Sequence, residues 1–397
     1  MTTQTLKNIS LRISSGGTPS RRHPEYFNIE SGHLWVKSKE LLDGGIGDTE
    51  EKITDEALNN SSAKYFPEHS VLIAMYGANV GQLGWLKNPA TVNQAVCGLV
   101  IDPKKADWRY VFYSLLQNRN NLTVQARGAA QQNLNQDLIK DFEIPLLPLE
   151  NQHSIADVLS TYDDLIKNNF RRIKILEQMA QAIYTEWFVN FRFPGHEKIK
   201  MVDPIKNGIS NGAGSGTDFG KIPEGWKVKR LGEKINISRG RNITKNTVER
   251  GNVPVVAGGL EPAYFHSTPN TEAPVFTVSA SGANAGFVNL YMENVWASDC
   301  SYIDKGVTPF VLYYFLLLKS RQVEVTGLQR GSAQPHVYPK DLSELLVVDV
   351  PDNLLKNFED VVSTIFSFVG NLKKQNKVLS DSRDLLLPKL VTGEIRV

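Results

Sequence analysis

The chain has little cysteine and almost no excess of charge of either sign. Only two of its 397 residues are cysteines, Cys97 and Cys300, which excludes a disulfide framework and a four-cysteine zinc site. Two free thiols suit a reducing cytoplasm. Lys and Arg number 44 and Asp and Glu number 42, so the formal net charge is +2. A surface for an acidic partner such as nucleic acid would therefore have to be a local concentration of positive charge.

Long apolar runs are also missing. The longest, residues 309–318, is far shorter than the roughly 20 residues that a bilayer-spanning helix needs. Residues 1–11 lack the basic start and apolar core of an export signal. The sequence therefore predicts no membrane association and a cytoplasmic location. Its 41% of apolar and 22% of charged residues are typical of folded proteins, and its length predicts two or three domains.

Recognisable catalytic motifs are absent from the sequence. It contains no Walker A phosphate loop, no His-Glu-x-x-His zinc motif and no Asn/Asp-Pro-Pro-aromatic motif of an amino-methyltransferase. Its only Pro-Asp pair, Pro351-Asp352, is not followed by the Glu-x-Lys of a metal-dependent nuclease. The stretch at residues 212–216 resembles a nucleophile elbow but lacks a strand before it and a helix after it. We therefore expect a non-catalytic binding or scaffolding protein.

The most informative feature that is present is an internal repeat. The Arg-Gly-Ala-Ala-Gln sequence at residues 127–131 recurs 203 positions later as Arg-Gly-Ser-Ala-Gln at residues 330–334, and Cys97 and Cys300 have the same separation. A Gly-Ala-Asn-x-Gly sequence at residues 77–81 recurs at residues 282–286. We interpret its glycines as a tight turn between strands that needs positive φ. The matches indicate two homologous halves of about 200 residues.

Each half begins with a part rich in Gly, Pro and short apolar runs and ends with a long helical stretch. Residues 71–76, 95–101, 275–279 and 295–303 are predicted strands, and residues 108–116 and 309–318 are predicted helices. Both long stretches carry apolar side chains mostly three and four residues apart, a heptad-like pattern. The first stripe consists of Ile155, Val158, Tyr162, Leu165, Ile173, Leu176 and Ile183. The second consists of Phe358, Val361, Ile365, Phe368, Leu372, Leu379 and Leu386.

Two arrangements of the long helices remain open. Each could pack on its own globular domain, or the two could bury their stripes in each other as an intramolecular antiparallel coiled coil, which we favour because the stripes match. Asn169 and Asn376 fall in the stripes and are candidates for setting the register. We expect an α+β fold with an internal two-fold repeat. Its segments are a domain at 1–150, a long helix at 151–190, a flexible linker at 191–221, a second domain at 222–352 and a second long helix at 353–397.

Several motifs together resemble one family. They are Gly-Lys-Ile-Pro-Glu-Gly-Trp at residues 220–226, Ile-Pro-Leu-Leu-Pro-Leu at residues 144–149 and Leu-Leu-Leu-Pro-Lys-Leu at residues 385–390. Their order and spacing are similar to those of the DNA specificity subunits of type I restriction–modification systems, across essentially the whole chain. The opening motif is missing from the first half, and the second Ile-Pro-Leu-Pro segment is reduced to Val350-Pro351.

The resemblance implies a non-catalytic reader of double-stranded DNA. Each domain would be a target recognition domain that binds one half of a bipartite, asymmetric sequence. The two helices would form the spacer and dock two methyltransferase (modification) subunits, which a restriction translocase–nuclease would join. AdoMet, ATP and Mg²⁺ would belong to the partner subunits, with no cofactor bound by this chain.

Candidate base-reading residues follow from the chemistry of the groove edges, because Arg pairs with guanine and Asn or Gln with adenine. In the first domain they are Arg21, Arg22, Lys37, Lys39, Arg127, Gln131 and Gln132. In the second they are Arg239, Arg241, Asn242, Lys245, Arg330 and Gln334. Any of these charges could instead be an ordinary solvated surface group. Arg127 and Arg330 recur in register, which also suits a phosphate contact shared by both domains.

Two other functions are open to a chain of this kind. A fragment of a fused restriction–methylation enzyme would need a methyltransferase or nuclease motif, which the sequence does not show. A bivalent scaffold could use its two domains to bind a ligand other than DNA. Salt-sensitive DNA binding distinguishes the scaffold from the DNA reader.

Overall fold

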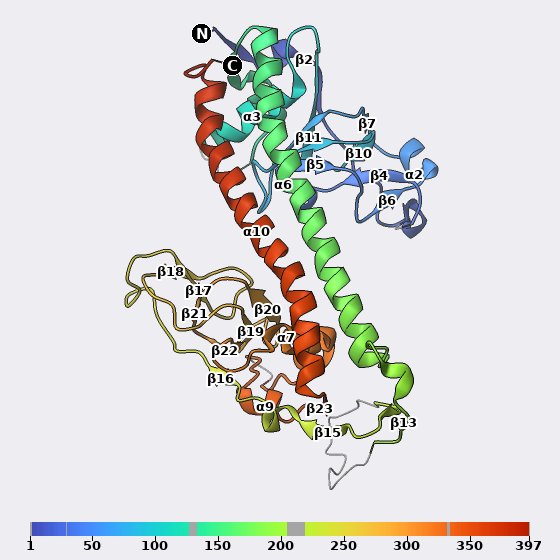
Figure 1. The fold of residues 1–397 in the computed structure, drawn as a ribbon. Coiled ribbons are helices and arrows are strands. Elements are labelled where there is room, and N and C mark those ends of the chain that lie inside the picture. The colour runs from blue at the N-terminus through green and yellow to red at the C-terminus, as the bar shows by residue number, and fades with distance from the viewer. Residues whose placement is uncertain (1, 29, 127–132, 205–218, 332–333, 397) are drawn as a thin grey trace. The chain divides into compact units, whose positions relative to one another are not determined.

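The computed structural model describes residues 2–28, 30–126, 133–204, 219–331 and 334–396 (Figure 1). The chain divides into two compact units. Unit 1 consists of Met1–Lys167 and Lys377–Val397, and unit 2 consists of Asn168–Asn376. There are two long helices, α6 (Leu149–Tyr184) and α10 (Asp352–Val391). Each has one stretch in unit 1 and another in unit 2.

Unit 1 contains two five-stranded sheets within its described residues. The first has the order β2-β11-β8-β9-β5 and the second the order β3-β6-β4-β10-β7. The first sheet consists of β2 (Ser10–Ser15), β5 (Gly44–Ile46), β8 (Val71–Ala74), β9 (Leu83–Leu86) and β11 (Val96–Ile101). The second consists of β3 (Phe27–Asn28), β4 (His33–Val36), β6 (Lys52–Ile53), β7 (Tyr65–Phe66) and β10 (Ala90–Val92). A further pair joins β1 (Thr2–Thr5) to β12 (Glu143–Leu146).

The central strands of the first sheet are buried on both faces. Val71 and Ile73 of β8 belong to one core cluster, whereas Leu72 and Ala74 belong to another. This explains why β8 is a continuous apolar run instead of an alternating one. Helix α3 contributes to the first of these cores. The helices of this unit are α1 (Leu6–Ile9), α2 (Asp55–Asn59), α3 (Trp108–Gln117), α4 (Arg119–Ala126) and α5 (Gln136–Asp141), with 3-10 turns at Pro24–Tyr26 and Ser38–Glu40.

Unit 2 repeats part of this topology in its described residues. Its main sheet has the order β16-β22-β19-β20, and a second sheet has the order β18-β17-β21. The strands are β13 (Met201–Val202), β14 (Ile222–Pro223), β15 (Lys227–Arg230), β16 (Ser238–Arg239), β17 (Val253–Val256), β18 (Tyr264–His266), β19 (Val275–Ser279), β20 (Val288–Tyr291), β21 (Trp296–Ala297), β22 (Cys300–Asp304) and β23 (Leu346–Asp349). The helices are α7 (Val311–Ser320), α8 (Gln322–Gly327) and α9 (Pro339–Ser343), with short 3-10 turns at His196–Lys198 and Leu231–Glu233.

The correspondence between the units follows the predicted repeat. The antiparallel run β11-β8-β9 matches β22-β19-β20, and the parallel pair β4–β10 matches β17–β21. Cys97 lies in β11 and Cys300 in the matching strand β22. The expectation of a mixed α+β fold with two repeated domains is confirmed.

The repeated glycine sequences form tight turns between the matching strands. Gly77 and Gly81 lie between β8 and β9, and Gly282 and Gly286 lie between β19 and β20, all with φ between 79° and 85°. A side chain at Gly81 would also lie 2.4 Å from Cγ2 of Thr123. The predicted positive φ of these glycines is therefore confirmed, and a side chain at Gly81 would also require Thr123 to move.

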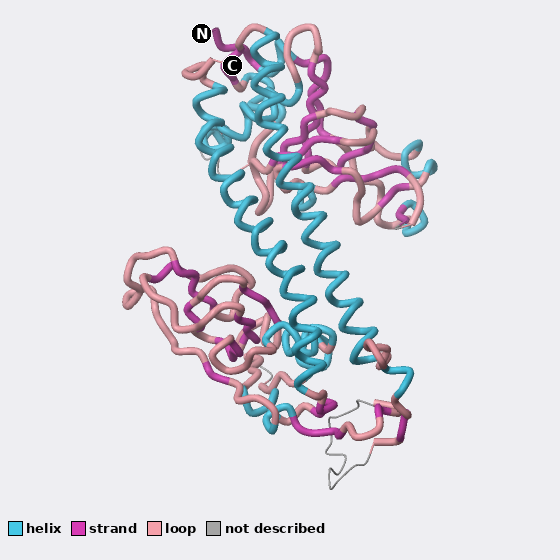
Figure 2. The backbone as a smooth tube through the Cα atoms, in the orientation of Figure 1, coloured by secondary structure: helices cyan, strands magenta, loops and turns pink. Residues whose placement is uncertain are grey.

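The long helices pack antiparallel within each unit (Figures 1 and 2). In unit 1, Nη1 of Arg383 in α10 lies 2.6 Å from Oδ1 of Asp163 in α6. In unit 2, Nζ of Lys373 in α10 lies 3.6 Å from Oε1 of Glu177 in α6. Helix α6 continues into a π-helical turn at Thr185–Val189.

The buried face of the helices differs from the predicted stripes at three positions. Leu165, Val361 and Phe368 are 46%, 44% and 55% exposed, so their assignment to a buried seam is wrong. In this part of α10 the fully buried positions are Phe358, Val362, Phe366, Val369 and Leu372. The face is rotated because α10 also packs on α7, where the ring of Phe366 lies 5.7 Å from that of Phe315. The remaining predicted stripe residues are buried or partly buried.

Asn169 and Asn376 form a buried polar pair in unit 2. Nδ2 of Asn169 donates to Oδ1 of Asn376 at 2.9 Å, and each residue is 6% exposed. Nδ2 of Asn376 has no partner among the described residues. An amide pair inside an apolar helix contact has one favoured alignment, so this pair is suited to fixing the register of the two helices.

Replacing only Asn169 by Leu should lower the free energy of unfolding by about 1–3 kcal/mol, because the amide of Asn376 would remain buried without a partner. Replacing both residues by Leu should restore most of this stability. Urea unfolding of the full chain in a double-mutant cycle measures the difference. A double variant less stable than both single variants would contradict this account.

Candidate nucleic-acid interface

The segment that contains Arg330 is held against the glycine turn of unit 2. Arg330 and His336 exchange backbone hydrogen bonds of 2.9 Å in both directions. The N–H of Gly282 donates to the carbonyl of Pro335 at 3.2 Å, and the N–H of Val337 donates to the carbonyl of Ala280 at 3.0 Å. The Arg-Gly-Ser-Ala-Gln motif therefore starts in a segment that β19 and its following turn position.

Two arginines and two aromatic rings gather at this place. The guanidinium of Arg239 lies 5.6 Å from the ring centroid of Tyr338, and the Tyr338 ring stacks on His336 at 5.7 Å. Nη2 of Arg330 lies 2.5 Å from Oδ1 of Asp341, while the Arg330 side chain remains 73% exposed. We call Arg239, Arg330, His336 and Tyr338 the unit 2 cationic cluster. It combines positive charge with aromatic rings, as do protein surfaces that bind nucleic acids.

The other candidates of unit 2 are exposed and lie outside the helices and strands. The N–H of Arg241 donates to the carbonyl of Ala297 at 2.9 Å, and its own carbonyl accepts from Nε1 of Trp296 at 2.8 Å, so its backbone is fixed. Asn242, Lys245 and Gln334 are exposed. The structure therefore leaves these side chains accessible to a ligand.

Most described candidates of unit 1 are already paired. Nζ of Lys37 and Nζ of Lys39 lie 3.1 and 2.5 Å from Glu50, and the guanidinium of Arg21 lies 2.7 Å from Glu51. Hydrogen bonds from Lys39 and Lys37 lower the pKa of Glu50. Each lysine or arginine here would have to exchange a carboxylate for a phosphate when DNA binds. Its net contribution to the free energy of DNA binding would therefore be reduced.

Arg22 is the candidate of unit 1 that differs from these. Its side chain is exposed and makes no hydrogen bond or ion pair with the described residues. Arg127, Gln131 and Gln132 lie outside the described residues, so their role stays a prediction.

Sequence reasoning missed three residues that the structure adds to these groups. His336 and Tyr338 belong to the unit 2 cationic cluster, and the guanidinium of Arg12 lies 4.2 Å from the ring centroid of Phe66 in unit 1. His336 and Tyr338 lie two and four positions after the end of the repeated motif, which is a signal that the sequence did contain. Arg12 pairs with a ring 54 positions away, which no local pattern shows.

Neither cysteine is suited to chemistry at neutral pH. Cys97 and Cys300 are buried and free, and burial raises the pKa of each thiol to about 12. Within the described ranges, no three His, Cys, Asp or Glu side chains form a group that could hold a metal ion. In the same residues, no helix combines the length and the apolar character needed to cross a membrane.

The two units share part of one strand topology and carry exposed cationic side chains, and the class of the protein follows from the family comparison. The chain matches the family described as the type I restriction modification DNA specificity domain over residues 20–178 and 223–352. It belongs to this family, which confirms the resemblance inferred from the sequence. Specificity subunits are the non-catalytic parts of type I restriction–modification systems.

Individual relatives agree with this assignment. The chain is 27% identical to the type I restriction enzyme MjaIX specificity subunit of Methanocaldococcus jannaschii, over 97% of this chain and 91% of the relative. It is 25% identical to the EcoBI specificity subunit of Escherichia coli, over 93% and 84%. Its fold is similar to the crystal structure of the type I restriction–modification S subunit from M. genitalium, with a TM-score of 0.64, 18% identity and coverage of 98% and 95%. The chain is a type I DNA specificity subunit.

Proposed function

We propose that each unit binds one half of a bipartite, asymmetric DNA sequence. The observation that carries this proposal is that matching strands of the two units display different side chains. Gly16 follows β2, and Gly240 follows the matching strand β16. A Cβ atom at either glycine would lie within 2.1 Å of a backbone carbonyl oxygen, of Val92 in unit 1 and of Ser298 in unit 2. The two glycines therefore mark equivalent positions.

The residues that flank these glycines differ in charge. Ser15 and Gly17 flank Gly16, whereas Arg239 and Arg241 flank Gly240. Equivalent positions thus carry no charge in unit 1 and two guanidiniums in unit 2. Since Arg is the side chain that pairs with both guanine and phosphate, the two half-sites should differ in sequence.

Arg239 and Arg330 are proposed to contact the DNA directly. Replacing Arg330 by Ala should weaken binding severalfold and reduce the slope of log affinity against log salt by about one, as expected for one lost phosphate contact. Arg330 also neutralises the buried Asp341, so its replacement could disturb the fold. Arg239→Ala is therefore a second variant, because this substitution removes no ion pair among the described residues.

Fluorescence anisotropy of the full chain with duplex DNA at several salt concentrations measures both quantities. Lys305→Ala is the matched control, because Lys305 follows β22 at the end of the sheet opposite to Arg239. An unchanged salt slope in both arginine variants would contradict the assignment of phosphate contacts to this cluster.

The long helices are proposed to form a coiled-coil spacer that docks two methyltransferase subunits, which a restriction translocase–nuclease joins. The antiparallel packing within each unit supports the coiled coil. Val361 and Phe368 are seven residues apart on α10, lie on one face and are exposed. Exposed apolar side chains aligned along a helix favour a protein partner. AdoMet, ATP and Mg²⁺ are assigned to these partner subunits, and no cofactor to this chain.

Methylation sequencing of the source genome tests this function. Deleting the gene should remove one bipartite N6-methyladenine motif, and the double variant Val361→Asp/Phe368→Asp should remove the same motif because the methyltransferase no longer docks. The control is Val323→Asp, at a residue that is 89% exposed on α8, and it should leave the methylome unchanged. A deletion that leaves every motif methylated, in cells that express the methyltransferase subunit, would contradict the proposal.

A further inference from the structure

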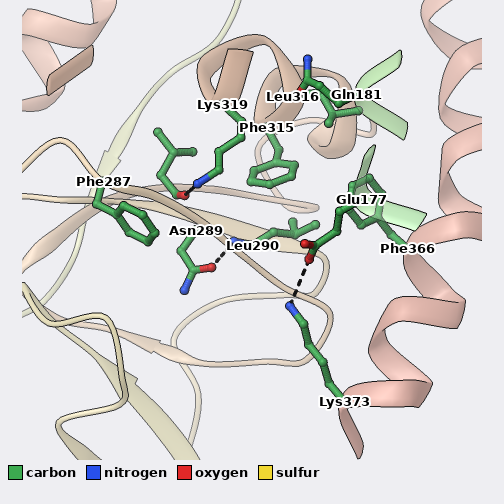
Figure 3. Close-up of a pocket in the computed structure, with 11 residues that line it drawn as sticks. Glu177, Gln181, Phe287, Asn289, Leu290, Phe315, Leu316, Lys319, Phe366 and Lys373 are labelled. Carbon is green, nitrogen blue, oxygen red and sulfur yellow. Dashed lines mark hydrogen bonds and ion pairs between the residues drawn. The ribbon is translucent and has the colours of Figure 1, made fainter. Parts of the chain in front are cut away.

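Unit 2 contains a cavity where α6, α7, α10 and β20 meet (Figure 3). Its volume is about 260 Å³. Much of its wall is apolar and comes from Phe287 beside β20, Leu290 in β20, Phe315 in α7 and Phe366 in α10. A cavity of this size can hold a ligand with the dimensions of a single aromatic ring.

Three charged groups also line this cavity, and their charges do not cancel. Nζ of Lys319 donates to the carbonyl of Val288 at 2.9 Å and lies 4.4 Å from the ring centroid of Phe287. No carboxylate among the described residues lies within ion-pair distance of this ammonium group. Nζ of Lys373 lies 3.6 Å from the carboxylate of Glu177. Two ammonium groups therefore face one carboxylate.

The environment of Lys319 disfavours its charge. Burial lowers the pKa of Lys319, and the carboxylate of Glu177 opposes this effect only in part. One carbonyl oxygen satisfies one of the three donors of the ammonium group. A second negative group in the cavity would balance the charge and accept a further hydrogen bond in surroundings where such bonds are strong.

We propose that this cavity binds a small amphipathic monoanion, with a carboxylate at Lys319 and an apolar body between the rings of Phe287, Phe315 and Phe366. Neither the family nor the DNA-binding function requires such a ligand, so this inference stands independently of the proposed function. Because α6, α7 and α10 all contribute to the wall, the bound ligand would link these helices and stabilise unit 2.

Benzoate and benzamide are matched probes, since they have the same size and differ in charge. Titrations of the full chain followed by saturation-transfer NMR should show saturable benzoate binding, with a dissociation constant on the order of 1 mM. Benzamide should bind at least about tenfold more weakly, because it lacks the charge that Lys319 requires. Equal affinity for the two probes, or no saturation by benzoate, would overturn the proposal.

Two variants locate the site. Lys319→Met keeps the apolar stem, and it should weaken benzoate binding about tenfold without changing benzamide binding. Lys305→Met, at an exposed lysine, is the control and should change neither. Gln181→Trp, on α6, should fill part of the cavity and weaken both probes while leaving Lys319 in place. Thermal melting verifies that each variant is folded, and unchanged benzoate binding in either cavity variant would place the ligand elsewhere.

Discussion

Replacing Phe358 by Ala should lower the free energy of unfolding by about 3–5 kcal/mol, the range for removing a fully buried aromatic ring. Phe358 has no exposed surface. Its ring centroid lies between 4.8 and 6.2 Å from those of Tyr184, Trp187, Phe188 and Tyr313. This one side chain of α10 therefore packs against the end of α6 and against α7. The cavity left behind could not close without moving all three elements.

Guanidinium unfolding followed by tryptophan fluorescence measures this loss. Phe368→Ala is the matched control on the same helix, and because Phe368 is 55% exposed its loss should change the stability by less than about 0.5 kcal/mol. If the Phe358 variant lost less than about 1 kcal/mol, the aromatic cluster would not be the centre of the unit 2 core.

Raising the pH from about 5 to about 8 should destabilise unit 2 through one carboxyl group. Glu359 of α10 accepts hydrogen bonds from the N–H groups of Leu312 and Tyr313 at 2.9 and 3.1 Å, in the first turn of α7. The residue before that turn, Phe310, provides no side-chain cap. Burial raises the pKa of Glu359 to about 7 from an ordinary value of 4.5, and the nearby charge of Asp360 acts in the same direction.

The sign follows from proton binding. The folded chain holds the Glu359 proton more tightly than the unfolded chain, so the stabilisation is fully present below about pH 4.5 and is lost as the pH rises through about 7. A shift of this size corresponds to at most about 3 kcal/mol. Urea unfolding across this pH range should show the loss in the parent chain.

Glu359→Gln should remove most of this pH dependence, because the amide oxygen still accepts a hydrogen bond but does not titrate. Glu261→Gln, at an exposed residue between β17 and β18, should retain it. A full pH slope in the Glu359 variant would assign the effect to other groups.

Features with a local or repeated signature could be predicted from the sequence. The two long helices, the repeated domains and the glycine turns all follow from periodicity or from a motif that recurs at a fixed separation. The buried face of α10 could not be assigned in the same way. Residues 361 and 362 are both valine, so periodicity alone cannot select the buried one. Val362 is the buried one, and it belongs to the core cluster that also contains the residues of α7.

The candidate interface was predictable as a set of residue types but not as an arrangement. Arg21 and Lys37 are candidates by chemistry, yet their pairing with Glu51 and Glu50 depends on a fold that brings together residues 30 and 13 positions apart. The cap of α7 by Glu359 comes from 47 positions away. Such long-range contacts cannot be predicted from a single sequence. His336 and Tyr338, by contrast, lie close to a repeated motif that the sequence shows.

The division of α10 between the units affects the order in which the chain can become structured during synthesis. Unit 2 is one continuous segment, but the core of unit 1 includes Leu387, Leu390 and Val391 together with residues near the start of the chain. The hydroxyl of Tyr110 donates to the carbonyl of Val391 at 3.2 Å, across 281 positions. During synthesis on the ribosome, the core of unit 1 therefore cannot be completed until all of unit 2 has been translated. During this interval its exposed apolar surface is available to chaperones, and a premature stop shortly after residue 376 would leave it permanently unfinished.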